Sequence, residues 1–546
     1  MNIRIRAASA VALLAMVATA CGGGGGGKSS GGSASTGGTS SPPTSSTPKV
    51  GGKIVVGLEA ESDGFDPTKN RWAISAYEEA STVMDPLTAV GNDGKIHPYL
   101  AESVTPNADY TVWTIKLRPN IKFSDGDPLT ADAVVTDLQA QQKSSLTGSA
   151  IQNIDTISKA DDLTVTVKCK TPWVPFPQYL AGQIGYIFSP KMLADPNGSQ
   201  KPVGTGPFVL KEWVPGNHFI VTKNPNYWQK GLPYLDSVEF RPILETQSRD
   251  NSLTAGTIDA MQSSDPQVSV DLKGNNSVNL VSDIENPGRN EINFVQINTA
   301  QAPLDDVTLR TALAYATDRK RYNDVIDFGI PHDATGPYSH KSDWAGDTGY
   351  PSFDLAKAKD LVKQYSAKHG GAAPTFELGT TNSGRNLQAA SLLQDMWKQA
   401  GINVTIKQVE QSQFILLALT GKYTAYLWRQ FGESDPDADV VWWSSPTAAP
   451  IGSLSLNFAR NKDPQIDSDL QTGRQSSDPA ARKAAYVDIG KQFAKDIPYV
   501  WLNETVWQVG TKKNVHNLGG WTMPDGTQAP VNPRSGFFMV SQVWQG

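Results

Sequence analysis

The sequence has 546 residues, of which 39% are hydrophobic and 19% charged, and its formal net charge is −6. A chain of this length can form two or three lobes with buried cores. The acidic balance argues against a nucleic-acid-binding protein, for which a basic excess is expected.

The first twenty residues have the features of a bacterial export signal. Arg4 and Arg6 give a basic start, a short apolar run follows, and small residues precede Cys21. The run is too short to span a membrane, which takes about 20 apolar residues. The segment Ala-Thr-Ala-Cys resembles a lipobox, with Ala18 where leucine is usual. We expect residues 1–20 to be a lipoprotein signal peptide and Cys21 to be lipidated; an ordinary signal peptide with an incidental cysteine is the alternative.

Residues 21–50 are rich in glycine, serine, threonine and proline, which predicts a flexible linker between the lipid and a globular body. The protein would then be held on the extracytoplasmic face of the cell membrane. Residues 22–29 match the phosphate-loop pattern G-x-x-x-x-G-K-S, and residues 27–31 match the hydrolase pattern G-x-S-x-G. Both motifs need a strand before them and a helix after them. Because neither is predicted here, we expect no nucleotide site and no nucleophilic serine in the linker.

After residue 51 the chain alternates between strand-like and helix-like patterns. The predicted strands are 53–60, 110–119, 162–170, 219–225, 235–243, 402–410 and 498–504. Apolar and polar residues alternate in 110–119, 162–170, 219–225 and 235–243, as in half-buried strands. A helical period occurs in 130–142, 307–326, 355–368, 386–401 and 478–496. Thr130 stands where a helix N-cap belongs, and Gly401 follows a helix directly. The alternation predicts an α/β fold.

The sequence contains no arrangement typical of a catalytic or metal site. None of the six histidines has metal-ligand spacing. The acidic run 435–439 lacks the glycine and glutamate of a calcium loop, since Val440 and Pro446 stand in their places. Cys169 lies alone in a strand pattern and is interpreted as a small buried hydrophobe, with a nucleophilic thiol as the alternative. We expect no cofactor, no metal and no enzyme activity. A carbohydrate hydrolase is the alternative of another class, because its paired carboxylates need no local motif.

Several segments match one family in the same order along the chain. The most specific is HPYLAESVTPNADYTVWTIKLRPNIKFSDGDPLTADAVVTDL at 97–138, with its P-x-L-A-E-S, L-R-P, K-F-x-D-G and P-L-T-A elements. The others are 203–243, 309–322, 395–410 and 498–518. Together they resemble the family 5 extracellular solute-binding proteins, whose members bind oligopeptides, dipeptides, nickel chelates or other solutes for ABC importers.

The resemblance implies a monomeric two-lobed clamp of the type II periplasmic-binding-protein fold, with an extra inserted subdomain. Closure of two lobes around a solute lets an importer distinguish loaded from empty protein. ATP hydrolysis would belong to a separate cytoplasmic subunit, and the partners would be a solute and the permease subunits. The expected boundaries are 51–90, 203–292 and 505–546 for lobe I, 91–202 for the inserted subdomain and 293–504 for lobe II.

In peptide-binding relatives, an aspartate ahead of a D-P-D element pairs with the α-ammonium group of the peptide. The corresponding position here is Gly432. The anchoring carboxylate is therefore either shifted to Glu433 or Asp435, with Asp437 beside them, or absent; a solvated acidic turn is the alternative. Arg429 could bind a carboxylate or sugar hydroxyls, or it could neutralise the acidic turn.

Aromatic residues near the same segment are further candidates for solute contact. Trp428, Trp442 and Trp443 bracket it, and Trp344 lies in a glycine-containing loop. Aromatic walls suit peptide side chains and sugar faces alike, although adjacent tryptophans point in different directions and at least one is expected in the core. Asn503 is a further candidate. Short peptides are thus the first expectation, and oligosaccharides or other organic solutes are the alternative.

Overall fold

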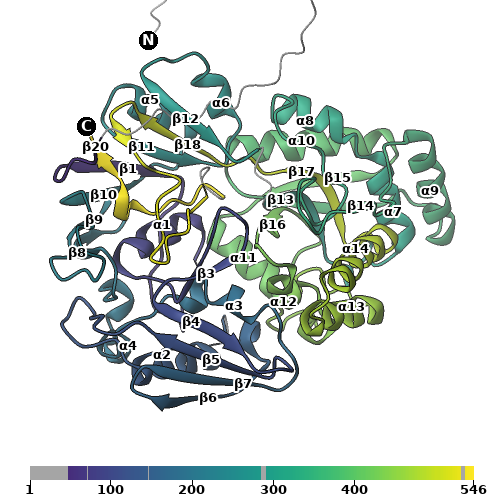
Figure 1. Ribbon diagram of the computed structural model, residues 1–546. Helices are drawn as coiled ribbons and strands as arrows, with labels where there is room; N and C mark the ends of the chain where they lie inside the picture. Colours follow the sequence, from purple (N-terminus) through teal and green to yellow (C-terminus); the bar gives the residue numbers. More distant parts are fainter. Residues whose placement is uncertain (1–46, 71, 145–146, 285–289, 531–534) are drawn as a thin grey trace, which may run out of the picture. The chain divides into compact units, whose positions relative to one another are not determined.

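The computed structural model describes residues 47–70, 72–144, 147–284, 290–530 and 535–546 (Figure 1). The chain divides into two units, Met1–Thr47 and Pro48–Gly546, and the second contains the described fold. The expected signal peptide, Cys21 and the linker up to residue 46 lie outside the described residues.

Lobe I is built on a seven-stranded mixed sheet. In spatial order its strands are β12 (Val278–Ser282), β18 (Gln508–Lys512), β11 (Ala260–Ser263), β1 (Lys53–Leu58), β10 (Ser237–Pro242), β9 (His218–Lys223) and β8 (Phe208–Val214). Strand β1 lies in the middle and runs parallel to both neighbours. Its apolar run is explained by burial on both faces, since Ile54 and Val56 join one hydrophobic cluster and Val55 packs against another. Helix α1 (Ile74–Val83) contributes to the first of these clusters.

A separate antiparallel sheet forms the inserted subdomain. Its strands, in spatial order, are β4 (Ala101–Pro106), β5 (Val112–Leu117), β7 (Thr164–Cys169) and β6 (Ile154–Asp161). Trp113, Ile115 and Leu117 alternate along β5 and are buried, as a strand with one covered face requires. Helix α2 (Ala131–Lys143) contacts β6 and β7. The Thr130 hydroxyl caps this helix by accepting a hydrogen bond of 3.3 Å from the Ala133 N–H, as expected.

Lobe II is built on a five-stranded mixed sheet. In spatial order its strands are β15 (Asn403–Gln408), β14 (Thr375–Thr380), β16 (Ala425–Gln430), β13 (Ile292–Ile297) and β17 (Tyr499–Glu504). Its longer helices are α9 (Leu355–Lys368), α10 (Gly384–Gln399), α11 (Gln411–Thr420), α13 (Pro464–Gln475) and α14 (Pro479–Asp496). Helix α9 spans the expected residues, and each of the other predicted segments of lobe II has its counterpart, with one exception.

The exception is the segment 307–326, where one helix was expected and two are present. Helix α7 (Val307–Ala316) ends before Thr317, and helix α8 (Arg319–Ile326) begins after Asp318. Thr317 leaves the helical conformation, and its hydroxyl accepts a hydrogen bond of 2.9 Å from the Trp397 indole. The Asp318 side chain then caps α8 through the Arg321 N–H. The helical period continues across the break, which is why periodicity alone did not reveal it.

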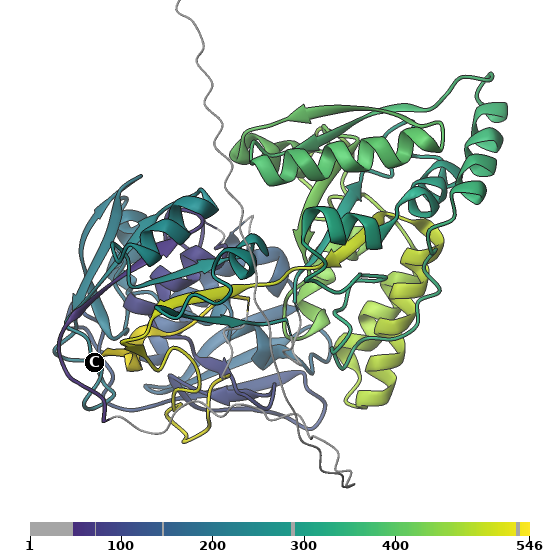
Figure 2. The ribbon, with the colours of Figure 1, turned by 90° about the horizontal axis from the view of Figure 1, so that it is seen from above.

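The chain passes between the lobes twice. The chain leaves lobe I after β12 and enters lobe II at β13, and it returns from β17 to β18. Strands β12 and β18 pair antiparallel, and so do β13 and β17. Figure 2 shows the returning segment passing from the sheet of lobe II into the sheet of lobe I. A hinge motion between two lobes would be absorbed where the chain passes from one lobe to the other.

Cys169 ends strand β7 and is buried in the core of the inserted subdomain. Burial raises the pKa of its thiol to about 12. The thiol therefore stays protonated at neutral pH, and a protonated thiol is a poor nucleophile. These surroundings agree with its interpretation as a small buried hydrophobe.

The buried carboxyl group of Asp283 predicts a pH-dependent stability. It follows β12 and accepts a hydrogen bond of 2.8 Å from the Trp507 N–H. Burial raises its pKa from 3.8 to about 8, so the folded state holds a proton that the unfolded state releases between these values. The free energy of unfolding should therefore fall as the pH rises through this window.

Urea unfolding at pH 5 and pH 8 measures this effect, and Asp283→Asn should make the difference between the two pH values smaller. Asp162→Asn, at an exposed aspartate in the turn between β6 and β7, is the control and should leave the difference unchanged. Equal slopes in the wild type and in Asp283→Asn would contradict the assignment.

Candidate solute-binding site

A cavity of about 630 Å³ lies between lobe I and lobe II. The wall from lobe II follows the end of β16 and includes Trp428, Arg429, Gly432, Glu433 and Trp442. The opposite wall comes from α1, the inserted subdomain and the C-terminal segment, and it includes Trp72, Tyr77, Gln178, Trp521 and Phe537. Because both lobes contribute, a solute held in the cavity would contact both at once.

Aromatic rings give this cavity its apolar character. Trp428 stacks on Phe414 with 5.3 Å between ring centroids and an interplanar angle of 14°, and its indole N–H donates to Gln430 at 3.0 Å. Trp442 packs against Phe458 at 5.2 Å. Rings fixed in this way present apolar area at little entropic cost when a ligand binds.

The charged lining of the cavity is predominantly acidic. Its carboxylates are Asp63, Glu291, Glu433 and Asp439, whereas its cationic groups are Lys69 and Arg429. Lys69 already pairs with Asp66 at 2.7 Å. Among the residues that the structure describes, Glu433 has no ion-pair or hydrogen-bond partner for its exposed carboxylate. A cationic group on a solute would therefore find a free carboxylate here.

Arg429 lies between two carboxylates at the floor of the cavity. Its Nε is 3.2 Å from Glu291 and its guanidinium reaches Glu59 at 3.4 Å, while its plane lies over the Trp507 ring at 4.8 Å. Burial raises the pKa of Glu59, but the guanidiniums of Arg429 and Arg249 outweigh burial and lower it. Arg429 thus neutralises Glu59 and Glu291 rather than the acidic turn, and its charge is already matched before any solute arrives.

Gly432 has no room for a side chain in this arrangement. A Cβ at this position would lie 2.8 Å from Cγ of Glu291 and 3.2 Å from its backbone nitrogen. The Glu291 carboxylate is held in place by Arg429 and by the Trp507 indole N–H at 2.9 Å. The space that a residue 432 side chain would occupy is therefore filled from the connection between the lobes.

The two aspartates of the D-P-D element lie outside the cavity, each bound by an arginine. Asp435 caps the short helix Pro436–Asp439 and pairs with Arg482 at 2.7 Å. Asp437 is fully buried and pairs with Arg474 at 2.8 Å. Both carboxylates are thus occupied by helices α13 and α14, which the local sequence does not show.

Three further candidates also lie away from the cavity. Trp443 is buried in the core of lobe II. Trp344 packs under the Arg482 guanidinium, 5.0 Å from its ring centroid. Asn503 is fully buried and donates to Asp327 at 2.7 Å. The structure therefore brings Trp428, Arg429, Glu433 and Trp442 together and places the other predicted residues in the framework of lobe II.

The lobe I wall was not predicted from the sequence. Its large aromatic residues include Trp72, Tyr77, Trp521 and Phe537. The first two lie hundreds of residues from the last two in the chain, and none of the four belongs to a motif. The only signal that points to them is their residue type, since large aromatic residues are common in ligand pockets and in cores alike.

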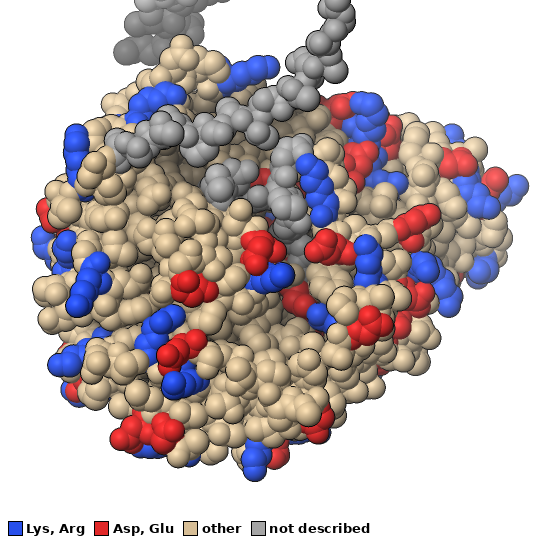
Figure 3. Space-filling model, viewed as in Figure 1, with Lys and Arg blue, Asp and Glu red and all other residues tan. Residues whose placement is uncertain are grey.

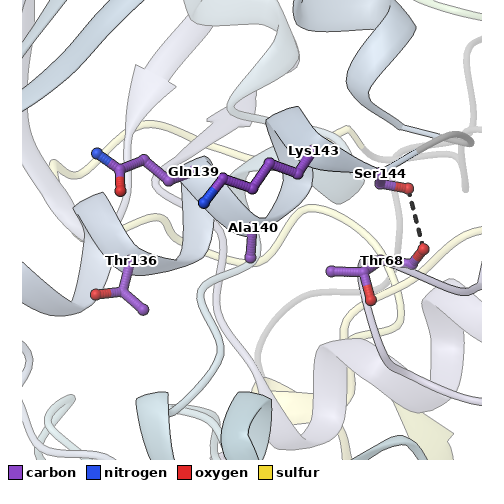
Figure 4. Close-up of a pocket in the computed structure, with 6 residues that line it drawn as sticks. All are labelled: Thr68, Thr136, Gln139, Ala140, Lys143 and Ser144. Atoms are coloured by element: carbon purple, nitrogen blue, oxygen red, sulfur yellow. Dashed lines mark hydrogen bonds between the residues drawn. The ribbon is translucent and has the colours of Figure 1, made fainter.

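A second pocket, of about 600 Å³, lies beside α2 and is shown in Figure 4. It is lined by Thr68, Thr136, Gln139, Ala140, Lys143 and Ser144, and the Ser144 hydroxyl donates to the Thr68 carbonyl at 3.1 Å. Among the lining residues that the structure describes, Lys143 is the one charged side chain and none is aromatic. The cavity between the lobes is therefore the stronger candidate.

Other kinds of site find no support in the described part of the chain. It contains no group of three histidine, cysteine or acidic residues placed to hold a metal ion. None of its helices is long and apolar enough to cross a membrane. On the face shown in Figure 3, positive and negative side chains are interspersed, and no single-sign patch of the kind that binds nucleic acid stands out.

Two α/β lobes with an aromatic cavity between them define the class of two-lobed solute-binding proteins. The family model described as bacterial extracellular solute-binding proteins, family 5 Middle, matches residues 95–450, and the chain belongs to that family. It is thus an extracytoplasmic solute-binding protein of the kind that serves ABC importers, and the relatives that it matches are binding proteins rather than enzymes.

Known relatives agree with this assignment. The glutathione-binding protein GsiB of Pectobacterium atrosepticum is 27% identical over 486 residues, which cover 86% of this chain and 92% of the relative. The fold resembles that of the periplasmic binding protein DppA from Helicobacter pylori in complex with the peptide STSA, with a TM-score of 0.80, 23% identity and coverage of 91% and 98%. It also resembles AppA from Bacillus subtilis in complex with a nonapeptide, with a TM-score of 0.78, 22% identity and coverage of 92% and 100%.

Proposed function

We propose that this protein captures a short peptide with a free amino terminus and delivers it to the permease of an ABC importer. The observation that carries the proposal is the exposed, unpartnered carboxylate of Glu433 in an aromatic cavity between the lobes. A peptide ammonium would form a charge-assisted hydrogen bond with it, and the rings would take up apolar side chains. The ligands named for GsiB, a glutathione-binding protein, and for DppA support a peptide or peptide-like solute.

The proposed mechanism is closure of the lobes around the solute. A solute can contact both walls at once only when the lobes are close. These contacts would be to Glu433 and Trp428 on lobe II and to Tyr77 and Trp521 on lobe I. A solute therefore shifts the open and closed populations by its differential affinity for them. The permease would read the closed form, and we propose that the protein acts as a monomer.

We also propose that Cys21 carries the lipid that holds the protein on the extracytoplasmic face of the membrane. The sequence Ala-Thr-Ala-Cys and the linker that follows support this. Intact mass of protein extracted from membranes tests it: a mass that begins at an acylated Cys21 is expected, and an unmodified cysteine would overturn it.

An oligosaccharide or another organic solute is the second candidate. The observation that favours it is the ring set of Trp428, Trp442, Trp72 and Trp521, because sugar faces stack on tryptophan as well as peptide side chains do. In that case the Glu433 carboxylate would accept hydrogen bonds from hydroxyl groups.

Replacing Glu433 with glutamine tests the amino-terminal anchor. Short peptides at about 100 times their dissociation constant should stabilise the wild type by about 2.7 kcal/mol, which thermal unfolding detects as a raised midpoint. Glu433→Gln should weaken binding by about tenfold or more, because a hydrogen bond to a charged group is lost. N-acetylated peptides should bind the wild type as weakly as free peptides bind the variant.

The matched control is Glu245→Gln, at an exposed glutamate that does not line the cavity, and it should bind like the wild type. Equal binding of free and acetylated peptides would overturn the ammonium anchor. A raised midpoint with oligosaccharides alone would establish the second candidate instead.

A further inference from the structure

The Asp437 carboxylate of lobe II receives hydrogen bonds from the opposite side of the cleft. Its Oδ2 accepts from the Trp173 indole N–H at 2.7 Å and from the Tyr179 hydroxyl at 3.0 Å. The same hydroxyl lies 2.7 Å from the Asp437 carbonyl oxygen. Asp437 belongs to lobe II, whereas Trp173 and Tyr179 lie between β7 and the end of helix α3 (Phe176–Tyr179) and belong to the core of the inserted subdomain. The exposed fraction of Asp437 is 0%, so these bonds are shielded from water.

The contact is reinforced by Arg474 at the end of α13. Its Nε lies 2.8 Å from Asp437, and its guanidinium lies over the Trp173 ring at 4.9 Å. Its carbonyl oxygen accepts a hydrogen bond of 2.9 Å from the Val174 N–H. Asp437, Arg474, Trp173 and Tyr179 together are termed the latch below; none of them lines the cavity.

Residues that are close to the latch in the chain line both walls of the cavity. Gln178 and Ala181 line the cavity beside Tyr179, and Asp439 and Trp442 line it beside Asp437. Formation of the latch therefore brings the two walls to their observed separation. A solute in the cavity and the latch would favour the same arrangement of lobes without touching each other.

The chemistry of the latch suits a contact that opens and closes. Asp437 and Arg474 are both in lobe II, so their ion pair remains when the lobes separate. When the lobes separate, Asp437 loses only its hydrogen bonds from Trp173 and Tyr179, and Arg474 loses the Val174 N–H and the stacked Trp173 ring. Water can replace the lost hydrogen bonds. A buried carboxylate that kept no partner in the open state would make opening far more costly.

We propose that Asp437 is a positioning residue that stabilises the closed arrangement through Trp173 and Tyr179, independently of any solute. The latch sets the fraction of the empty protein that is closed. It thereby also sets how much of the binding free energy of a solute is used to close the lobes. The inference rests on the proposed closing mechanism, but its test needs no solute.

The test is hydrogen–deuterium exchange of the Val174 amide in the solute-free full-length protein. Tyr179→Phe removes one latch donor with little change in volume. It should speed exchange of this amide by up to about tenfold, since a hydrogen bond to a charged group favours the closed state by about that factor. Exchange of core amides such as Val295 in β13 should stay unchanged.

The matched control is Tyr350→Phe. Tyr350 and Tyr179 have the same exposed fraction, 7%, and the Tyr350 hydroxyl donates at 3.0 Å to the Tyr499 carbonyl within lobe II. This variant should leave Val174 exchange unchanged. Asp437→Asn, which keeps an acceptor oxygen but weakens the ion pair, should act like Tyr179→Phe. Unchanged Val174 exchange in both latch variants, or a rise matched by the Val295 amide, would overturn the proposal.

These outcomes are separate from those of the peptide experiment. If peptides fail to bind while Tyr179→Phe still speeds Val174 exchange, the solute proposal is wrong and the latch stands. If peptides bind through Glu433 but Val174 exchange does not respond, the latch is wrong and the solute proposal stands.

Discussion

Asp327→Ala should lower the free energy of unfolding by about 3–5 kcal/mol, the cost of removing one partner from a buried ion pair. The Asp327 carboxylate ends helix α8 and is fully buried. It accepts hydrogen bonds from the Arg385 Nε at 3.1 Å and from the Asn503 amide at 2.7 Å, and a second guanidinium nitrogen of Arg385 also contacts it. Its loss would leave a cation and a buried amide without their shared acceptor.

The same helix offers a matched control. Asp324 pairs with Lys320 at 2.6 Å, but both side chains are largely exposed. Asp324→Ala should therefore change the free energy of unfolding by less than about 1 kcal/mol. Urea unfolding followed by tryptophan fluorescence measures both variants. A similar cost for the two would show that the Asp327 network does not stabilise lobe II, and would reopen Asn503 as a residue available to a solute.

Gly432→Asp should also be strongly destabilising, by about 2–4 kcal/mol. Overpacking accounts for about 1–3 kcal/mol, because the new Cβ would lie 2.8 Å from Glu291 Cγ. Repulsion between two neighbouring carboxylates adds the rest, although Arg429 offsets part of it. The variant should also bind peptides more weakly, since the cavity floor must rearrange.

Gly384→Asp is the control for this substitution. A Cβ at Gly384 meets nothing within 4 Å, and the residue begins helix α10, where a negative charge is favourable. Its stability should equal or slightly exceed that of the wild type. Glu291→Ala combined with Gly432→Asp should recover part of the loss, because the clashing side chain is gone. A stable Gly432→Asp protein with tighter peptide binding would show that an aspartate can serve as the anchor here, against our assignment to Glu433.

Local patterns predicted much of the secondary structure because they depend on near neighbours. The helical period of 355–368 gave helix α9, and Thr130 capped α2 as expected. The same reasoning missed the break at Thr317, because the helical period continues across it and the Trp397 indole that donates to Thr317 lies eighty residues away in the chain. It did not identify α1 as a separate helix either, because buried polar residues such as Glu78 and Glu79 interrupt the apolar stripe that marks a helix in the sequence.

The sequence predicted half of the candidate site for a similar reason. Trp428, Arg429, Glu433 and Trp442 lie within one short segment, so a motif on that segment was enough to indicate them together. Asp435 and Asp437 lie in the same segment but are bound by Arg482 and Arg474, whose proximity only folding creates. The opposite wall belongs to residues with no motif at all.

By itself, the sequence determined the family and the two-lobed α/β fold, and it indicated the segment of lobe II that lines the cavity, because these depend on motifs and periodicities within short stretches. Only the tertiary structure decided which carboxylates are free. Glu433 and Asp437 are four residues apart, yet one faces an open cavity and the other is sealed between lobes by an arginine, a tryptophan and a tyrosine. The availability of a charge to a ligand depends on burial and on partners distant in the chain, which no local pattern records.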